Sequence, residues 1–425
     1  PPPPRAAMLD VAMGGGMGGD DGANQDTVRR QNLGAVLRQM HRAGQLSRAA
    51  LTTATGLSRS TVAGLVADLE DRGLVDEGDA VVTGSPGRPS PVVHIRGDAV
   101  AVVAADLQIS RVTTAVIGLG GDVRHRTSRD RPIGRREVEA TLDQLCELIE
   151  QAVVDAGATQ IIGLGVSVPG IVRHDDGHVH LAPNLGWTDV PLGDLLRERL
   201  AASRTAVAVG NEADLGALAE HVHGAGAGTR DMVYVSGATG IGGGVIVGGR
   251  PLTGVAGYGG EVGHMVVNPD GLACRCGSVG CWETEAGQAA LLRHMGWADS
   301  DEQRVVAAVL SEAAAGSARA GTALAEGGRW LGLGLAPLFN LFNPPPVVLG
   351  GLYARAFPHL IDAVRQEVDG RSLRPSRALA AITPAMLGED SSLLGAGELA
   401  LTPLLADPTV VERTAGDPRT QTQPA

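Results

Sequence analysis

Apolar residues near the start of the chain recur at helical spacing and predict three short helices. The first carries apolar residues three and four positions apart, at Leu33, Val36, Leu37 and Met40. A second helix is predicted over 47–54 and a third over 58–72, because Ser47 and Ser58 are good N-cap residues. The short connection between them contains Gly56, so the pair has the pattern of a helix-turn-helix.

A β-hairpin is predicted after the third helix. Apolar strands at 80–82 and 92–95 flank a turn rich in Gly and Pro at 84–87. A hairpin in this position forms a wing. Residues 26–96 therefore resemble winged helix-turn-helix DNA-binding domains.

This domain is expected to read DNA with the start of its third helix in the major groove and an arginine of the wing in the minor groove. The predicted DNA contacts are Arg48, Ser58, Arg59, Ser60, Thr61 and Arg88. Nine arginines against seven acids leave 26–96 with a net charge of only +2. The basic face is expected to comprise Arg29, Arg30, Arg48, Arg59 and Arg88, with the acids turned away. The alternative is a winged helix that contacts proteins.

From Gly97 onward, short apolar strands alternate with glycine-rich turns and longer helices. Strands are predicted at 99–105, 111–117 and 161–170, the last ending at a glycine turn, and a helix at 137–156. A strand, a glycine turn and a second strand occur twice, at 99–117 and 232–247, where the second turn is predicted over 237–244. This repetition predicts a duplicated α/β architecture.

Composition and charge narrow the function classes. All 35 basic residues are arginine and the net charge is −12, which argues against a protein that coats nucleic acid along its whole surface. No run of about twenty apolar residues is present, so we expect no membrane span and a cytoplasmic protein. The Pro- and Gly-rich segments 1–25 and 405–425 are expected to be a disordered leader and tail.

Three of the four cysteines fall within eight residues, at Cys274, Cys276 and Cys281, and His264 precedes them by ten. One histidine and three cysteines are a tetrahedral ligand set typical of structural Zn²⁺ sites. A disulfide is the alternative, but it would leave one cysteine of the three over. Glu261 and Glu283 flank these ligands and add two carboxylates to the same loop.

Several motifs together resemble the ROK family (repressors, open reading frames and kinases), a branch of the actin-like, ribonuclease-H-like sugar kinases. The resemblance covers about residues 26–402. It rests on the His264, Cys274, Cys276, Cys281 set and on the segments 183–187 (PNLGW), 239–244 (TGIGGG), 260–264 (GEVGH) and 348–351 (VLGG). It implies a first lobe at 97–210, completed by a C-terminal helix at about 388–404, and a second lobe with the zinc loop at 211–387.

The resemblance also implies a sugar between the lobes. The positions that match the family's sugar site are Asn211, Glu212, Glu261, His264 and Glu283. Charged acceptors suit this task because their hydrogen bonds to hydroxyl groups are strong and directional. Zinc with four protein ligands would orient His264 and would not activate water.

Two departures from the family's kinases predict that phosphoryl transfer is lost. The kinases carry Asp-x-Gly-Gly-Thr at the first strand turn, where 106–110 here reads DLQIS. A β-branched isoleucine fits poorly where a phosphate must approach the main chain. The kinases also use the Asp of Asn-Asp-Ala-Asn as catalytic base, and Glu212 replaces it here. The longer side chain displaces the carboxylate by about 1 Å, which can cost about 100-fold in rate.

The sequence therefore predicts a non-catalytic, zinc-containing, sugar-responsive DNA-binding regulator, a repressor of genes for carbohydrate uptake or metabolism. Its expected partners are a palindromic double-stranded operator and a small sugar or sugar phosphate, bound by a homodimer or a dimer of dimers. The alternatives are an ATP-dependent sugar kinase and a sugar-binding protein whose winged helix contacts other proteins.

Overall fold

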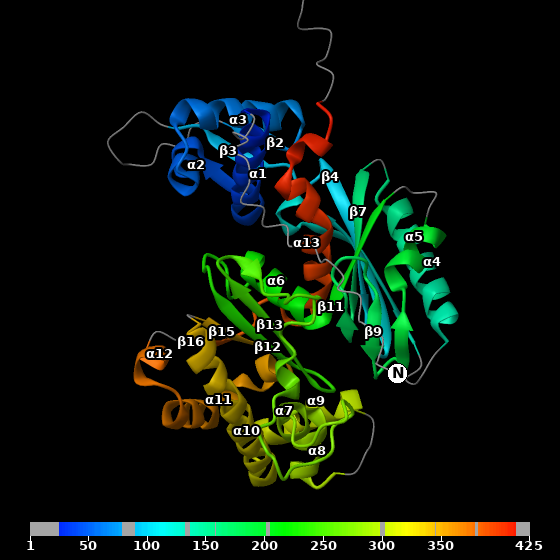
Figure 1. Ribbon diagram of the computed structural model, residues 1–425, viewed down its shortest axis with the longest axis vertical. Helices are drawn as coiled ribbons and strands as arrows, with labels where there is room; N and C mark the ends of the chain where they lie inside the picture. The colour runs from blue at the N-terminus through cyan, green and yellow to red at the C-terminus, as the bar shows by residue number, and fades with distance from the viewer. Residues whose placement is uncertain are drawn as a thin grey trace, which may run out of the picture.

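The computed structural model describes residues 25–78, 90–131, 137–157, 159–200, 205–297, 302–344, 346–378 and 381–413. Figure 1 shows a small domain at the top, built from the N-terminal part of the chain, and two α/β lobes below it. The C-terminal helix α13 (Ser391–Ala406), red in Figure 1, runs from the small domain down between the lobes.

The small domain has the three predicted helices and the predicted strand at 92–95, and it adds a short strand between the first two helices that the sequence did not predict. Its helices are α1 (Gln25–Ala43), α2 (Arg48–Thr55) and α3 (Arg59–Asp71). Its sheet has the order β1 (Gln45–Ser47), β3 (Val92–Ile95) and β2 (Val75–Gly78). Both predicted caps form, since the hydroxyls of Ser47 and Ser58 accept from the amides of Ala50 and Thr61 at 3.1 and 3.2 Å. The predicted strand 80–82 and turn 84–87 lie outside the described residues.

The first lobe is a five-stranded sheet with a smaller sheet beside it. Across the larger sheet the order is β11 (Ala206–Asn211), β7 (Gln160–Val168), β4 (Val100–Leu107), β5 (Arg111–Gly118) and β6 (Val123–Asp130). The smaller sheet is β10 (Trp187–Val190), β9 (Val179–Ala182) and β8 (Ile171–Val172). Helices α4 (Val138–Asp155) and α5 (Leu192–Arg199) and the short helix η1 (Leu119–Gly121) complete the lobe.

The two faces of β4 are buried against different helices. Ala101 and Val103 belong to the apolar cluster that includes α4, whereas Val102 and Ala104 belong to the cluster that includes α13. This alternation follows from the two-residue period of a strand. It explains why β4 reads as a continuous apolar run, as expected of a strand that is covered on both sides.

The second lobe repeats the strand arrangement of the first. Its sheet order is β14 (Arg250–Pro251), β13 (Ile241–Val247), β12 (Met232–Gly237), β15 (Pro346–Gly351) and β16 (Ala381–Pro384). In each lobe an antiparallel pair, β4–β5 or β12–β13, is followed by a parallel neighbour, β7 or β15. The predicted glycine turn at 237–244 is shorter than expected, because β13 begins at Ile241 and its glycines pair with β12.

Helices cover the second sheet on both sides. They are α6 (Glu212–His223), α7 (Trp282–Ala286), α8 (Gln288–Met295), α9 (Glu302–Ala314), α10 (Ala318–Phe342), α11 (Leu352–Arg371) and α12 (Arg374–Ala378). Within the described part of the chain, no helix combines the length and apolar character needed to cross a bilayer.

One apolar cluster joins the small domain to the first lobe. It contains Leu37 and Met40 of α1 together with Leu401 and Leu404 of α13. The two helices approach so closely at Gly34 that a Cβ there would lie 2.5 Å from the carbonyl oxygen of Ala406. The small domain is therefore packed against α13 and does not hang on a tether.

The expectation of a disordered tail from 405 is wrong for residues 405–413. A short helix, η5 (Pro408–Val410), follows α13, and Val411 is buried in the cluster shared with α1. Arg72, the residue that follows α3, donates to the carbonyl oxygen of Val411, and Arg413 lies 3.0 Å from Asp68. These apolar and ionic contacts with α1 and α3 give the segment a folded partner that its composition does not reveal.

Candidate functional site

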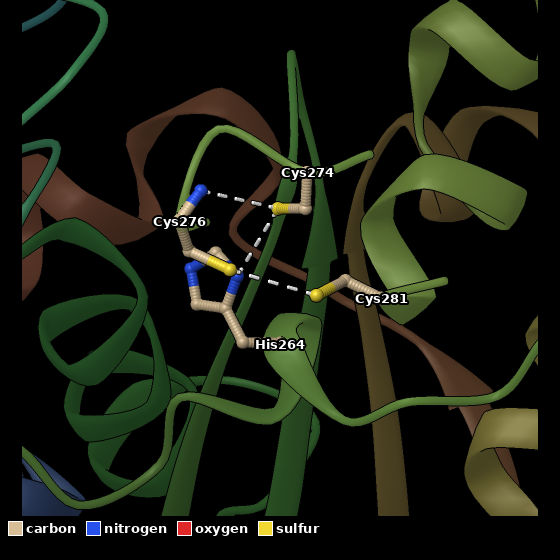
Figure 2. A group of neighbouring side chains, drawn as sticks. All are labelled: His264, Cys274, Cys276 and Cys281. Carbon is tan, nitrogen blue, oxygen red and sulfur yellow. Dashed lines mark hydrogen bonds between the residues drawn. The ribbon is translucent and has the colours of Figure 1, made fainter. Parts of the chain in front are cut away.

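The predicted metal ligands lie together in one loop of the second lobe (Figure 2). Cys274 Sγ is 3.7 Å from His264 Nδ1, and Cys276 Sγ is 3.6 Å from Cys281 Sγ. The four ligand atoms all lie within 4.8 Å of one another. Ligands at tetrahedral Zn–S distances of about 2.3 Å are separated by about 3.7 Å, so this donor set fits a single ion.

A disulfide does not describe these cysteines. All three are free, and the 3.6 Å between Cys276 and Cys281 is far longer than an S–S bond of about 2.05 Å. Single β-bridges pair Val266 with Cys281 and Ala273 with Val279, so the backbone holds the ligands close together.

Glu283 lies directly beside the metal-ligand cluster. Its Oε1 accepts from Cys274 Sγ at 2.9 Å and lies 3.7 Å from His264 Nδ1. Its other oxygen lies against Gly240, where a Cβ would meet it at 2.3 Å. Glu283 therefore links the cysteine loop to the turn between β12 and β13.

Asn211 and Glu212 occupy the start of α6, where the two lobes meet. Asn211 Oδ1 caps the helix by accepting from the amides of Ala213 and Asp214 at 2.7 and 3.2 Å. Its Nδ2 donates to the carbonyl oxygen of Gly170 in the first lobe at 2.8 Å. The Asn211 side chain thus holds α6 against the turn that follows β7.

Several carboxyl groups gather at this junction. Burial raises the pKa of Glu212 to about 8, with the negative charges of Asp106 and Glu261 adding to the shift. Burial and the charge of Glu261 raise the pKa of Asp214 to about 7, and burial also raises the pKa of Glu261. Carboxyl groups with such pKa values can both donate to and accept from hydroxyl groups near neutral pH.

The five residues predicted to bind sugar form two adjacent groups. His264 and Glu283 contact each other in the cysteine loop, and Asn211 Nδ2 donates to Glu212 Oε2 at 3.2 Å. Glu261 connects the groups, since its charge influences Glu212 and is itself influenced by Glu283. Their role in sugar binding stays a prediction.

Sequence reasoning missed some neighbours of this site. Asp106 and Asp214 were not expected to share it, although Asp214 follows Glu212 by two residues. Arg275 lies between two of the metal ligands, and its Nη1 donates to Asn184 Oδ1 of the first lobe at 2.9 Å. Asn184 belongs to the sequence motif 183–187, and this motif was the feature from which its place near the site could have been predicted.

The predicted DNA contacts cluster at the start of α3. Ser58, Arg59, Ser60 and Thr61 are all exposed. The hydroxyl of Ser58 lies 3.0 Å from that of Ser60 and 2.8 Å from that of Thr61. This end of α3 presents hydroxyl groups, one arginine and the helix N-terminus to solvent, a combination that suits phosphate and base edges.

The expectation that the acids turn away from the basic face is wrong. Arg29 is paired with Asp68 at 2.8 Å, Arg30 with Asp407 at 3.6 Å, and Arg48 with Glu77. Arg48 would have to leave Glu77 to bind DNA. Arg88 lies outside the described residues, so Arg59 is the described arginine of the predicted face for which the structure records no ion pair.

A sequence model of the ROK family matches residues 102–402, which is most of the chain. The chain belongs to the ROK family. A model of the MarR family matches residues 34–82, within the small N-terminal domain. The two matches divide the molecule as the structure does, into a MarR-type winged helix and a ROK domain of two lobes.

The relatives of this ROK protein include regulators and kinases. The xylose repressor of Bacillus subtilis (strain 168) is 29% identical over 384 residues, covering 90% of this chain and 97% of the repressor. The glucokinase of Halalkalibacterium halodurans is 34% identical over 255 residues, covering 57% of this chain and 76% of the kinase. A crystal structure of a ROK family transcriptional regulator, a homolog of the E. coli MLC protein, matches with a TM-score of 0.73 and 25% identity. It covers 89% of this chain and 97% of that one.

The turn 106–110 of the ROK domain has a definite arrangement. Asp106 is buried at the end of β4, and its Oδ2 accepts from Gln108 Nε2 at 2.7 Å. The side chain of Gln108 is therefore held by the acid two residues before it.

The raised pKa of Glu212 predicts a pH-dependent stability. The carboxyl group ionises at about pH 4.5 when unfolded but near pH 8 when folded, so it destabilises the fold progressively as pH rises through this range. Glu212→Gln should therefore gain stability relative to wild type between pH 5 and pH 8, by about 3.5 kcal/mol at about 1.4 kcal/mol per pKa unit. Urea unfolding at the two pH values measures this gain.

The exposed Glu150 of α4 provides the matched control. Glu150→Gln should follow the wild-type pH profile. Unfolding curves of Glu212→Gln that also run parallel to wild type would contradict the assigned shift.

Proposed function

We propose that this protein is a sugar-responsive, DNA-binding transcriptional repressor of genes for carbohydrate uptake or metabolism. The observation that carries the proposal is the union of a MarR-type winged helix and a ROK domain in one packed body. The xylose repressor relative covers nearly the whole of this chain, whereas the glucokinase relative covers little more than half.

The proposed effector is a small sugar or sugar phosphate bound between the lobes. Glu212, Glu261 and Glu283, with Asn211 and His264, would bond its hydroxyl groups. Acceptors from three segments, 211–212, 261–264 and 283, sort sugars by the direction of each hydroxyl group. A sugar that bridges α6 and the cysteine loop would stabilise one relative placement of these elements over another.

We propose that the ROK domain has no kinase activity. Gln108 bonds to Asp106 in the turn that would receive the ATP phosphates, and Ile109 follows it. Glu212 stands at the position of the catalytic base. Both changes leave hydroxyl recognition intact.

The DNA surface proposed here is the start of α3, with Ser58, Arg59, Ser60 and Thr61. We propose that two copies bind a palindromic operator as a homodimer, since one small domain on a protein of net charge −12 would bind weakly. A transcription regulator of this kind works in the cytoplasm.

The metal proposed for His264, Cys274, Cys276 and Cys281 is structural Zn²⁺. The ion would crosslink the loop and fix the orientation of the His264 ring. Cys276→Ser should reduce bound zinc from about one equivalent to less than a tenth and remove the sugar response, because the loop loses its crosslink.

Elemental analysis of the purified protein measures the zinc. Cys146→Ser, which changes a cysteine of α4 far from the loop in sequence, should keep its zinc. Purified wild-type protein that lacks stoichiometric zinc would contradict this part of the proposal.

The repressor proposal is tested with an operator selected from random duplexes and a sugar found by thermal shift. The sugar should change the operator Kd of the wild-type protein by about tenfold. Glu261→Ala should weaken sugar binding by roughly 10- to 100-fold, through loss of charged hydrogen bonds of about 1.5–3 kcal/mol each, and keep its zinc.

Two controls accompany this measurement. Glu312→Ala removes an ion pair with Arg319 in the second lobe and should respond to sugar as wild type does. Arg59→Ala should weaken operator binding without changing sugar affinity. If Arg59→Ala binds the operator as tightly as wild type, a winged helix that contacts proteins would be favoured. If Glu261→Ala binds the sugar with unchanged affinity, the proposed position of the sugar site is wrong.

A sugar kinase is the second candidate, favoured by the glucokinase relative at 34% identity. A coupled assay with ATP, Mg²⁺ and a panel of hexoses separates the two functions. We expect turnover far below the 1–100 s⁻¹ that kinases reach. Turnover above about 1 s⁻¹ on any sugar would replace the regulator proposal with the kinase.

A further inference from the structure

Three side chains from three different helices meet where the small domain, the first lobe and the second lobe come together. They are His41 near the end of α1, His223 at the end of α6 and Glu398 in the middle of α13. His41 Nε2 lies 2.9 and 3.0 Å from the two oxygens of Glu398, and His223 Nε2 lies 2.7 Å from Oε1. Glu398 and His41 are only 3% and 1% exposed.

The hydrogen-bond partners decide where the proton of His41 resides. The amide of Gly120 in η1 donates to His41 Nδ1 at 2.9 Å, so this nitrogen carries no proton. The ring proton is therefore on Nε2, which donates to Glu398. His223 Nε2 donates to Oε1 of the same carboxylate, and the two imidazole rings lie edge to face with centroids 5.2 Å apart.

This buried carboxylate is held in its charged form. Burial alone would raise the pKa of Glu398, but the hydrogen bonds from His41 and His223 outweigh burial and hold the pKa at about 2. A buried charge that loses a donor costs far more than a surface one. Neither histidine can therefore move away alone without penalty.

The same three groups lie close enough to ligate a metal ion, but the tautomer opposes this. A histidine nitrogen that carries a proton has no lone pair for a metal. Coordination by His41 Nε2 would require the ring to give up the Gly120 bond or to lose its one N–H proton. The arrangement is a hydrogen-bonded joint.

Helix α6 connects this joint to the proposed effector site. It starts at Asn211 and Glu212 and ends at His223, 12 residues and about 18 Å later. Helix α13 touches α6 so closely that a Cβ at Gly395 would lie 1.9 Å from the carbonyl oxygen of Leu215. Because α6 moves as one rigid helix, a displacement at its start also displaces His223 at its end.

We propose that His41, His223 and Glu398 are the positioning residues that transmit a movement of α6 at the effector site to the DNA-reading domain. This inference rests on the proposed function. Since α1 carries His41 and packs against α3, a shift of Glu398 that follows α6 moves the whole reader together with α6.

Glu220 provides a matched control on the same helix. It is also a fully buried carboxylate, and it accepts from the amides of Ala225, Met386 and Leu387 and from the hydroxyl of Ser391. These donors belong to the ROK domain. Glu220→Gln should therefore destabilise the fold without disconnecting the reader.

The experiment compares Glu398→Gln with Glu220→Gln in the full-length protein. Sugar affinity, operator affinity with and without sugar, and amide hydrogen exchange across α1 are measured for each. We expect Glu398→Gln to keep its sugar Kd within about twofold, to lose at least four-fifths of the sugar-induced change in operator Kd, and to exchange α1 amides at least tenfold faster. Glu220→Gln should keep the sugar-induced change.

A pair of substitutions at His223 separates transmission from simple stabilisation. His223→Gln keeps an N–H donor and should preserve the response, whereas His223→Leu removes it and should abolish the response. The proposal is overturned if Glu398→Gln responds to sugar as wild type does, or if both His223 variants behave alike.

Hydrogen exchange keeps this test independent of the proposed function. If a bound sugar leaves operator affinity of the wild-type protein unchanged, the repressor proposal fails. The proposal for the joint is then tested by amide hydrogen exchange alone. It is supported if sugar changes the exchange rates of α1 amides in the wild-type protein but not in Glu398→Gln. It is overturned if sugar leaves the exchange rates of α1 in the wild-type protein unchanged.

Discussion

The structure depends on one apolar contact, the packing of α1 against α13. Leu33, Val36, Leu37 and Met40 share one apolar cluster with residues of α13, a helix that also packs against β4 and β7 of the first lobe. With only 2% aromatic residues, the chain achieves this burial with small aliphatic side chains and close helix approaches, as at Gly34. A DNA reader packed in this way shares the orientation of the lobe beneath it, so the position of α3 is a property of the whole molecule.

The second lobe is joined to this body mainly through α6. Asn211 caps the helix and bonds to Gly170 of the first lobe, and Glu398 receives the other end through His223. The cysteine loop reaches the same junction from the far side, where Arg275 bonds to Asn184. These polar contacts at both ends of α6 accompany its close packing against α13, where Leu215 shares the apolar cluster of the reader and the first lobe. The second lobe is therefore connected to the rest of the molecule through the α6–α13 pair.

Local signals in the sequence predicted the local features well. Ser47 and Ser58 cap helices where expected, and the spacing of His264 with the three cysteines gave a ligand set whose atoms lie within 4.8 Å. The sequence contained no comparable signal for contacts between distant segments. The bond between His41 and Glu398 spans 357 residues, and Val411 is buried although its segment reads as a tail. Asp68 is one of the acids expected to turn away from the basic face, yet it is 4% exposed and binds Arg29, Arg72 and Arg413. These outcomes depend on which helix lies opposite, which periodicity does not encode.

The most direct test of the central claim, that the DNA reader and the first lobe form one rigid body, is ¹⁵N relaxation of backbone amides in the sugar-free protein. Amides of α1 and α3 should give the same rotational correlation time as amides of β4 and β7, because the four elements share one core. A markedly shorter correlation time for α1 and α3 would mean that the reader tumbles on a tether, and it would contradict the account.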